Sequence, residues 1–373
     1  MWQPARRLSS CDQTEMMTKL SGQVLGPLDT PTYGKCLMKK AIALCVFVFF
    51  VLPLFTGLIL CCGAEAPAFR PDQVWLDASG QPIQAHGGGI LQYGGTYFWF
   101  GENKAGKTYN HRVDVIGVSC YSSRDLYHWN NEGVVLPAVK NDPASDLAPS
   151  KVLERPKVVY DRHTKQFVMW MHVDTADYKY ARAGVAVSNK PTGPYEYLGS
   201  FRPDNSMSRD LTVFQDDDGK AYLIFASGDN RTMHITRLSD NYLRPTNETA
   251  RVFIDQSREA PAMFKHEGKY FLITSGCTGW APNAAQYAVA TNIMGPWRIK
   301  GNLTTGPGSE TTFGAQSTFV LRVAGKPGAF IFLADCWNPD DLGDSRYVWL
   351  PIGIHGEDLK IEWRDQWDLS VFK

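Results

Sequence analysis

The chain has 373 residues, of which 44% are hydrophobic and 20% charged, so it can bury a large core and is not wholly disordered. Basic and acidic residues both number 38, which gives a formal net charge of zero. A nucleic-acid surface needs a basic excess to neutralise phosphates, so this class of partner is excluded. Aromatic residues make up 12%, a content that fits a sugar ligand with flat apolar faces as well as an ordinary β core.

The first part of the chain has the features of an export segment. Residues 41–62 contain no charge, and a methionine and two lysines (38–40) stand directly before them. A positive start followed by an apolar run is typical of a signal peptide, and this run is also long enough to span a bilayer. We therefore expect residues 38–66 to be a signal peptide or membrane anchor, and residues 1–37 to be an unstructured tail or a wrongly assigned start. In both cases the body is secreted or extracytoplasmic, with any membrane contact made through the apolar run.

The body of the chain, residues 71–373, contains three cysteines: Cys120, Cys277 and Cys336. Their wide spacing is neither a disulfide framework nor a zinc-ligand pattern. The sequence leaves open whether two of these cysteines form a disulfide while the third stays a free thiol.

A hairpin signal repeats five times along the body. Each copy is a turn with glycine or a charge that leads into an apolar, aromatic-rich strand, which is typical of a β-hairpin. The copies are roughly 50 to 70 residues apart, close to the size of a four-stranded propeller blade. Their turns lie near residues 95, 164, 219, 268 and 328.

A polar residue stands before each hairpin, at the start of the preceding apolar strand. It precedes an aromatic residue of the hairpin by 11 to 14 positions, so the five polar residues occupy near-equivalent places in the repeat. The first strand of a propeller blade lines the central channel, so five such strand starts converge at one mouth. The sequence thus predicts an all-β fold, a five-bladed β-propeller, in preference to a barrel or sandwich. The converging residues are His86, Glu154, Asp210, Glu259 and Gln316.

Three of the converging residues are acids, and each has an arginine neighbour: Arg155, Arg209 or Arg258. Like charges at one mouth raise one another's pKa, which keeps one carboxyl protonated so that it can act as a general acid. Glycoside hydrolysis needs such an acid and a second group that positions water or attacks. Alternatively, the acids and arginines form salt bridges that hold the blades together. We expect no cofactor and no catalytic metal. The sequence leaves open a structural calcium ion bound by these acids in the channel, but no EF-hand-like spacing supports it.

Five short motifs lie at these positions in chain order. They are Ala85-His-Gly-Gly-Gly-Ile, Glu154-Arg-Pro-Lys-Val, Ser208-Arg-Asp-Leu, Arg258-Glu-Ala-Pro and Ala315-Gln-Ser-Thr-Phe. From Gln73 to its end the chain resembles glycoside hydrolase family 43, and within it the branch that contains exo-β-1,3-galactanases. The resemblance implies a five-bladed propeller, hydrolysis with inversion, and action at chain ends or side chains.

The resemblance also implies roles for the converging residues. By motif, Glu259 corresponds to the general acid and Asp210 to the residue that tunes the pKa of the acid. The aspartate base that most members carry in the first blade is absent, and His86 with three glycines occupies that stretch. In the galactanase branch a glutamine is thought to hold the water, and Gln316 matches it. Glu154 matches a substrate-binding glutamate of the same branch.

Further residues around the mouth are expected to contact the substrate. Trp280 lies in a polar loop after a blade strand and is the best candidate for a sugar platform, ahead of Tyr93, Trp99, Tyr178 and Trp337. The substrate-binding residues that we predict are Glu154, His86, Trp280, Arg209 and Arg258.

The sequence therefore predicts a monomeric, inverting, exo-acting glycoside hydrolase that cleaves a galactose-containing polysaccharide or oligosaccharide such as β-1,3-galactan. One alternative is another family 43 specificity, namely arabinofuranosidase, xylosidase or galactofuranosidase. A second is a non-catalytic carbohydrate-binding propeller, because a neutral glutamine amide is a poor base.

Overall fold

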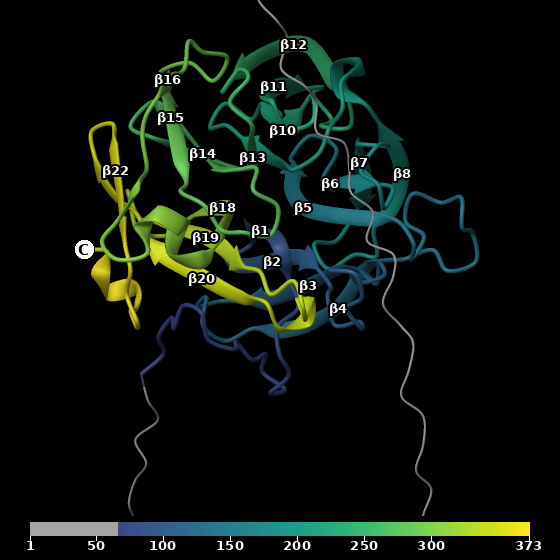
Figure 1. Ribbon diagram of the computed structural model, residues 1–373, viewed down its shortest axis with the longest axis horizontal. Coiled ribbons are helices and arrows are strands. Elements are labelled where there is room, and N and C mark those ends of the chain that lie inside the picture. The colour runs from purple at the N-terminus through teal and green to yellow at the C-terminus, as the bar shows by residue number, and fades with distance from the viewer. Residues whose placement is uncertain (1–65) are drawn as a thin grey trace, which may run out of the picture. The chain divides into compact units, whose positions relative to one another are not determined.

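The computed structural model describes residues 66–373, and these form an all-β propeller (Figure 1). The tail, residues 1–37, and all but the last residue of the expected signal or anchor segment, 38–66, lie outside this part. Within the described residues no helix is long and apolar enough to cross a membrane.

Four sheets have four antiparallel strands each, and in every one the strands follow the sequence order from the inner strand to the outer strand. The first two are β1 (His86–Tyr93), β2 (Thr96–Glu102), β3 (Gly117–Ser123) and β4 (Asn130–Pro137), then β5 (Val152–Asp161), β6 (Gln166–Asp174), β7 (Arg182–Ser188) and β8 (Glu196–Phe201). The next two are β9 (Leu211–Gln215), β10 (Ala221–Ser227), β11 (Thr232–Leu238) and β12 (Pro245–Val252), then β13 (Arg258–His266), β14 (Lys269–Gly276), β15 (Gln286–Ala290) and β16 (Arg298–Ile299).

Two more sheets have three strands each, so the described residues form six sheets and the prediction of five blades was wrong in its count. One contains β18 (Gln316–Arg322), β19 (Phe330–Cys336) and β20 (Arg346–Pro351). The other contains β17 (Thr304–Thr305), β22 (Asp358–Glu362) and β21 (Gly353–His355), with β17 and β22 parallel. The repeat did not reveal this small sheet, because β17 and β21 have only two and three residues and only β22 is long enough to show an alternating pattern.

The first strands of five sheets surround a common axis. β1 lies against β5, β5 against β9, β9 against β13, β13 against β18, and β18 against β1. This closed ring brings together strand starts that are far apart in the sequence, as the repeat predicted (Figure 1).

Strand β6 shows how the sheets are held together. Its residues Phe167, Met169 and Met171 pack with side chains of the β1–β4 sheet, whereas Val168 and Trp170 pack with those of the β9–β12 sheet. Successive side chains of a strand point to opposite faces, so β6 is buried on both and reads as a continuous apolar run. Each such side chain contributes about 1.5–3 kcal/mol when it leaves water.

The two ends of the described region meet. The backbone N–H of Phe69 donates to the carbonyl of Trp367 at 2.7 Å, and the N–H of Trp367 donates back at 3.1 Å. The two rings stack with their centroids 4.4 Å apart. These contacts fasten the segment before β1 to the segment after β22.

Candidate active site

Four of the five residues predicted to converge line one cavity of about 440 Å³. Glu154 lies in β5, Asp210 directly before β9, Glu259 in β13 and Gln316 at the start of β18. The cavity therefore lies where four strands of the inner ring begin.

A β-bulge follows the cavity-lining glutamate in both β5 and β13. The strand register shifts after Glu154 and after Glu259, and the next residues, Arg155 and Ala260, have left-handed backbone with φ of 55° and 53°. In a regular strand, consecutive side chains point to opposite faces, whereas a bulge turns them relative to the ladder. The bulge in β5 explains why Glu154 and Arg155, although adjacent, both line the cavity.

Glu259 is bonded at both oxygens of its carboxyl group. Gln316 Nε2 donates to Oε1 at 2.9 Å, and Asn230 Nδ2 donates to Oε2 at 2.8 Å. The thiol of Cys277 also contacts this carboxyl group. Burial, followed by the negative charge of Asp210, raises the pKa of Glu259 to about 7. A carboxyl with such a pKa is partly protonated at neutral pH and can give its proton to a substrate.

The guanidinium of Arg155 connects Asp210 with Gln316. It pairs with Asp210 Oδ2 at 3.0 Å and donates to Gln316 Oε1. It also donates to the carbonyl of Ser317 at 3.0 Å. Asp210 in turn accepts a bond from the backbone N–H of Ala260 at 3.1 Å. Asp210 is thereby fixed next to Glu259, the acid whose pKa it raises.

The side-chain amide of Gln316 uses all of its hydrogen-bonding capacity. Its oxygen accepts bonds from Arg155 and, at 3.1 Å, from Trp337 Nε1. Its nitrogen donates to Glu259 and, at 3.1 Å, to Ser275 Oγ. Because arginine and tryptophan only donate, the amide oxygen must face them, and the nitrogen must face Glu259.

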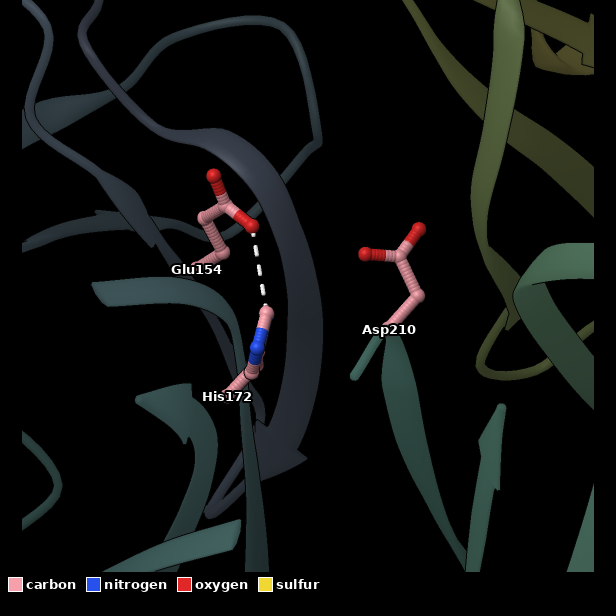
Figure 2. Close-up of side chains that lie close together, drawn as sticks. All are labelled: Glu154, His172 and Asp210. Atoms are coloured by element: carbon pink, nitrogen blue, oxygen red, sulfur yellow. Dashed lines mark hydrogen bonds and ion pairs between the residues drawn. The ribbon is translucent and has the colours of Figure 1, made fainter. Parts of the chain in front are cut away.

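Glu154 is held by a buried histidine, as Figure 2 shows beside Asp210. His172 Nδ1 lies 3.2 Å from Glu154 Oε2, and its Nε2 lies 2.9 Å from Asp174 Oδ2. Burial acts to lower the pKa of His172, but the bonds to Asp174 and Glu154 outweigh it and raise the pKa to about 9. Burial likewise acts to raise the pKa of Glu154, but the bond to His172 and its charge lower it to about 2. Glu154, which also accepts a bond from Tyr178 Oη at 2.7 Å, is therefore an ionised acceptor.

Glu154, His172 and Asp210 bring one potential metal-ligand atom each within 4.8 Å of one another (Figure 2). Calcium prefers six to eight oxygen ligands, whereas this group offers two carboxylates and a histidine. Both nitrogens of His172 already face carboxylates, and the pKa of about 9 keeps the ring protonated, without a free lone pair. The chemistry of these three residues therefore fits an ion-pair network and does not fit a calcium ion.

His86, the fifth converging residue, lies outside the residues that line the cavity. Its side chain is fully buried and stacks on Tyr347 with the ring centroids 5.0 Å apart. The next residue, Gly87, has a φ of 57°, and a Cβ there would lie 2.2 Å from an oxygen of Glu102. The first sheet thus packs its strand start tightly, and this position does not support the predicted contact of His86 with substrate.

The two arginines predicted to bind substrate occupy different places. Arg209 lines the cavity and donates to Asp229 Oδ1 and to the carbonyl of Tyr178, both at 2.9 Å. Arg258 instead turns into its own sheet, where it donates to Thr274 Oγ1 at 3.0 Å and to the Thr274 carbonyl at 2.8 Å. Arg258 is not among the residues that line the cavity, so its position supports a structural role.

Three of the five candidate sugar platforms reach the cavity: Tyr178, Trp280 and Trp337. Trp280 is 42% exposed, and its ring meets that of Trp337 edge-on with the centroids 5.9 Å apart. Trp99 is a core residue, and Tyr93 packs against Tyr160. The loop position of Trp280 was therefore a useful signal, whereas strand aromatics such as Trp99 belong to the core.

Comparisons with known proteins show the family of the chain. The family model of the glycosyl hydrolases family 43 matches residues 89–326. The chain belongs to glycosyl hydrolase family 43. No curated protein matches it.

Among solved family 43 structures, several are similar to this chain. A β-1,3-galactosidase is 40% identical over 82% of this chain, with a TM-score of 0.77, and the chain spans 64% of its length. A second β-1,3-galactosidase, solved with galactodeoxynojirimycin, is 39% identical over 81% of this chain and 100% of its own, with a TM-score of 0.76. An exo-β-1,3-galactanase from Phanerochaete chrysosporium, solved with galactose, is 37% identical over 81% of this chain and 68% of its own, with a TM-score of 0.75.

Several residues of this family 43 site were missed from the sequence. Asn230 and Cys277 contact Glu259, and His172 with Asp174 holds Glu154. These residues lie in turns, loops or second strands, outside the repeat position that revealed the others. The only available signal was their side-chain chemistry, which is too common to single them out.

Lys157 was also missed. Its side chain is buried among the inner strands, and its Nζ donates to the carbonyl of Gly87 at 2.8 Å. Burial, with the nearby charge of Arg155, lowers the pKa of Lys157 to about 7. All three cysteines of the body are free, so the sequence's option of one disulfide is not realised.

Proposed function

We propose that the chain is an inverting, exo-acting glycoside hydrolase that removes galactose from β-1,3-galactan or a similar polysaccharide. The observation that carries the proposal is Glu259, a cavity-lining carboxyl whose pKa is raised to about 7 beside Asp210. Glycoside hydrolysis needs a carboxylic acid of this kind to protonate the leaving oxygen. The similarity to two β-1,3-galactosidases and an exo-β-1,3-galactanase supports galactose as the sugar.

Each group of the cavity has a part in the proposed reaction. Glu259 gives its proton to the glycosidic oxygen as the bond to the anomeric carbon breaks. Gln316 orients the water that attacks that carbon from the opposite face, and the attacking water releases its proton to solvent, because Arg155 and Trp337 already occupy the Gln316 oxygen. Direct attack by water forms no glycosyl intermediate, so the configuration inverts. Glu154, kept ionised by His172, accepts hydrogen bonds from sugar hydroxyls. Asp210 keeps the pKa of Glu259 high enough for the acid to hold its proton.

The main competing function is a carbohydrate-binding propeller without turnover. It is favoured by the first sheet, where His86 is buried and offers no carboxylate to the cavity. The other family 43 specificities, arabinofuranosidase, xylosidase and galactofuranosidase, depend on how the cavity reads the sugar ring. A panel of aryl glycosides separates these three from a galactosidase.

The experiment is to incubate the purified protein with β-1,3-galactan and to measure galactose release. Wild-type protein should release galactose, and Glu259→Gln, which cannot protonate the leaving group, should lose at least about 100-fold in rate. Glu267→Gln is the matched control, because Glu267 lies exposed at the far end of the same β13–β14 hairpin. Binding of galactan without release would favour the binding module, and release that survives Glu259→Gln would refute the assignment of the acid.

We further propose that the protein is exported, because a positive start precedes the apolar run of residues 41–62. N-terminal sequencing of protein recovered outside the cytoplasm tests this. Cleavage near residue 66 indicates a signal peptide, retention of the apolar run in a membrane fraction indicates an anchor, and an intact chain in the cytoplasm contradicts export.

A further inference from the structure

We propose that Asn230 is a positioning residue for Glu259 and that its amide supports this acid in both of its protonation states. The inference rests on the proposed role of Glu259 as general acid. It concerns a turn residue of a neighbouring sheet to which neither the repeat nor the family motifs gave a role.

The turn between β10 and β11 aims Asn230 at the acid. Residues Gly228, Asp229 and Asn230 all have left-handed backbone, with φ of 60°, 56° and 61°. Asparagine tolerates this conformation better than most residues do. The turn belongs to the β9–β12 sheet, but the amide reaches Glu259 in β13, where Nδ2 donates to Oε2 at 2.8 Å.

The other end of the same amide is unsatisfied. Asn230 Oδ1 is buried and accepts no hydrogen bond within residues 66–373. A buried acceptor without a donor costs about 1–3 kcal/mol. Rotating the amide by half a turn exchanges Oδ1 and Nδ2, which places the oxygen against Glu259.

The two orientations of the amide match the two forms of the acid. A carboxylate only accepts hydrogen bonds, so ionised Glu259 needs the Nδ2 orientation. A protonated carboxyl has one O–H donor, so protonated Glu259 bonds to Oδ1 and satisfies the orphaned oxygen. Gln316 cannot alternate in this way, because Arg155 and Trp337 fix its oxygen.

In the reaction this arrangement holds the acid before and after proton transfer. Protonated Glu259 donates to Asn230 Oδ1 until the glycosidic oxygen takes the proton and its bond to the anomeric carbon breaks. The carboxylate left behind then accepts from Nδ2. Asn230 therefore keeps the carboxyl group aimed at the leaving oxygen without touching the reacting atoms.

A contact of Asn230 with the sugar is the competing explanation, because Asn230 also lines the cavity. The way the rate depends on the leaving group separates a positioning role of Asn230 from a contact with the sugar. Galactan has a poor leaving group that needs protonation, whereas dinitrophenol leaves without a proton. A defect in the acid is therefore suppressed with dinitrophenyl β-galactoside, but a lost sugar contact weakens both substrates equally.

The test compares Asn230→Gly with wild type on both substrates. Glycine suits a φ of 61°, so the turn is retained while the amide is removed. We expect kcat/KM to fall about 10- to 100-fold on galactan and less than about 3-fold on the aryl galactoside, a part of the usual acid-catalysis effect. Asn247→Gly, an exposed asparagine in β12, should change neither. Equal losses on both substrates, or no loss on galactan, would overturn the proposal.

Two further variants test the proposed role of Asn230 independently. Asn230→Asp keeps an acceptor, loses the donor and adds a negative charge, so it should raise the pKa of Glu259 and move the alkaline limb of kcat/KM to higher pH. An alkaline limb that stays at the wild-type pH in Asn230→Asp would contradict the proposal. Glu259→Ala should show a stronger leaving-group dependence than Asn230→Gly. If Glu259→Ala itself loses both substrates equally, the proposed function fails; if only Asn230→Gly does, the inference about Asn230 fails alone.

Discussion

The side-chain amide of Gln316 donates to Glu259 Oε1 across 2.9 Å, so the group that should hold the water contacts the group that should give the proton. In inverting glycosidases the two corresponding groups are about 6.5–9.5 Å apart, because a water and the sugar lie between them. Substrate binding must therefore break this hydrogen bond. Gln316 is held by Arg155 and Trp337 at its oxygen, so Glu259 is the partner that we expect to turn away.

The role of Gln316 can be tested by removing its side chain. Gln316→Ala should lower kcat on galactan by at least about 100-fold, because the attacking water loses its orientation. Azide needs no help from a base, so added azide should restore part of the turnover and yield an α-galactosyl azide. Kinetics and product analysis with and without azide provide the measurement. Wild-type rates in the variant would exclude Gln316 from the water site.

The pKa of Glu259, with its proposed role as general acid, predicts how galactan hydrolysis should depend on pH. The acid must be protonated, so kcat/KM should fall as pH rises through about 7, by roughly tenfold per pH unit beyond it. Asp210→Asn removes the charge that raises this pKa, so the fall should move to lower pH. Asp217→Asn, in an exposed hairpin turn, is the control and should leave the profile unchanged. A limb that moves upward in Asp210→Asn would contradict the assigned pair.

Arg155 should matter for both stability and activity. Arg155→Met leaves Asp210, whose side chain is only 14% exposed, without its ionic partner, a change that costs about 3–5 kcal/mol of unfolding free energy. It also removes a positive charge that lowers the pKa of Glu259, so the alkaline limb should move to higher pH. Arg155→Lys keeps the positive charge but loses the forked guanidinium that spans Asp210 and Gln316. The alkaline limb of its pH profile should therefore stay in place, while its kcat/KM should fall.

Denaturant unfolding and pH profiles check this prediction. The control is Arg237→Met, which breaks an exposed pair with Glu248 and should cost less than about 1 kcal/mol. Equal costs for the two methionine variants would show that Arg155 is only a surface-like ion pair.

His172 should make folding stability depend on pH. Its pKa is raised from 6.5 to about 9 in the folded protein, so the associated stability is fully present below about pH 6.5 and is lost as pH rises through 9. The shift corresponds to about 3 kcal/mol. His172→Gln should be less stable at pH 6 and should lack most of this decline, whereas His128→Gln, at an exposed site, should behave like wild type. Unfolding free energies measured from pH 6 to 10 decide the matter, and parallel curves for wild type and His172→Gln would contradict the ion-pair network.

The repeat in the sequence predicted the inner ring because its signal is geometric. A polar residue 11 to 14 positions before a hairpin aromatic marks a near-equivalent place in each sheet, and four of the five such residues line one cavity. His86 is the exception, because it occupies the equivalent position along the chain but is not among the residues that line the cavity. Its side chain is fully buried and stacks on Tyr347.

Other parts of the site could not be predicted because they depend on contacts between sheets. The bulge after Glu154 brings Arg155 into the cavity, and the residues Glu154-Arg-Pro do not predict this shift in register. Asn230 reaches Glu259 from a turn of another sheet, and His172 reaches Glu154 from the neighbouring strand. Arg258, by contrast, sits beside the acid in the sequence but turns into its own sheet. The sequence neighbours of Glu259 are thus poor guides to its spatial neighbours.

We propose that the chain releases galactose from the end of β-1,3-galactan with inversion. The most direct test is proton NMR of the products in the first minutes of digestion, before the released sugar mutarotates. We expect α-galactose to appear first, with no larger internal fragments. First appearance of β-galactose, or of internal oligosaccharides without galactose, would contradict it.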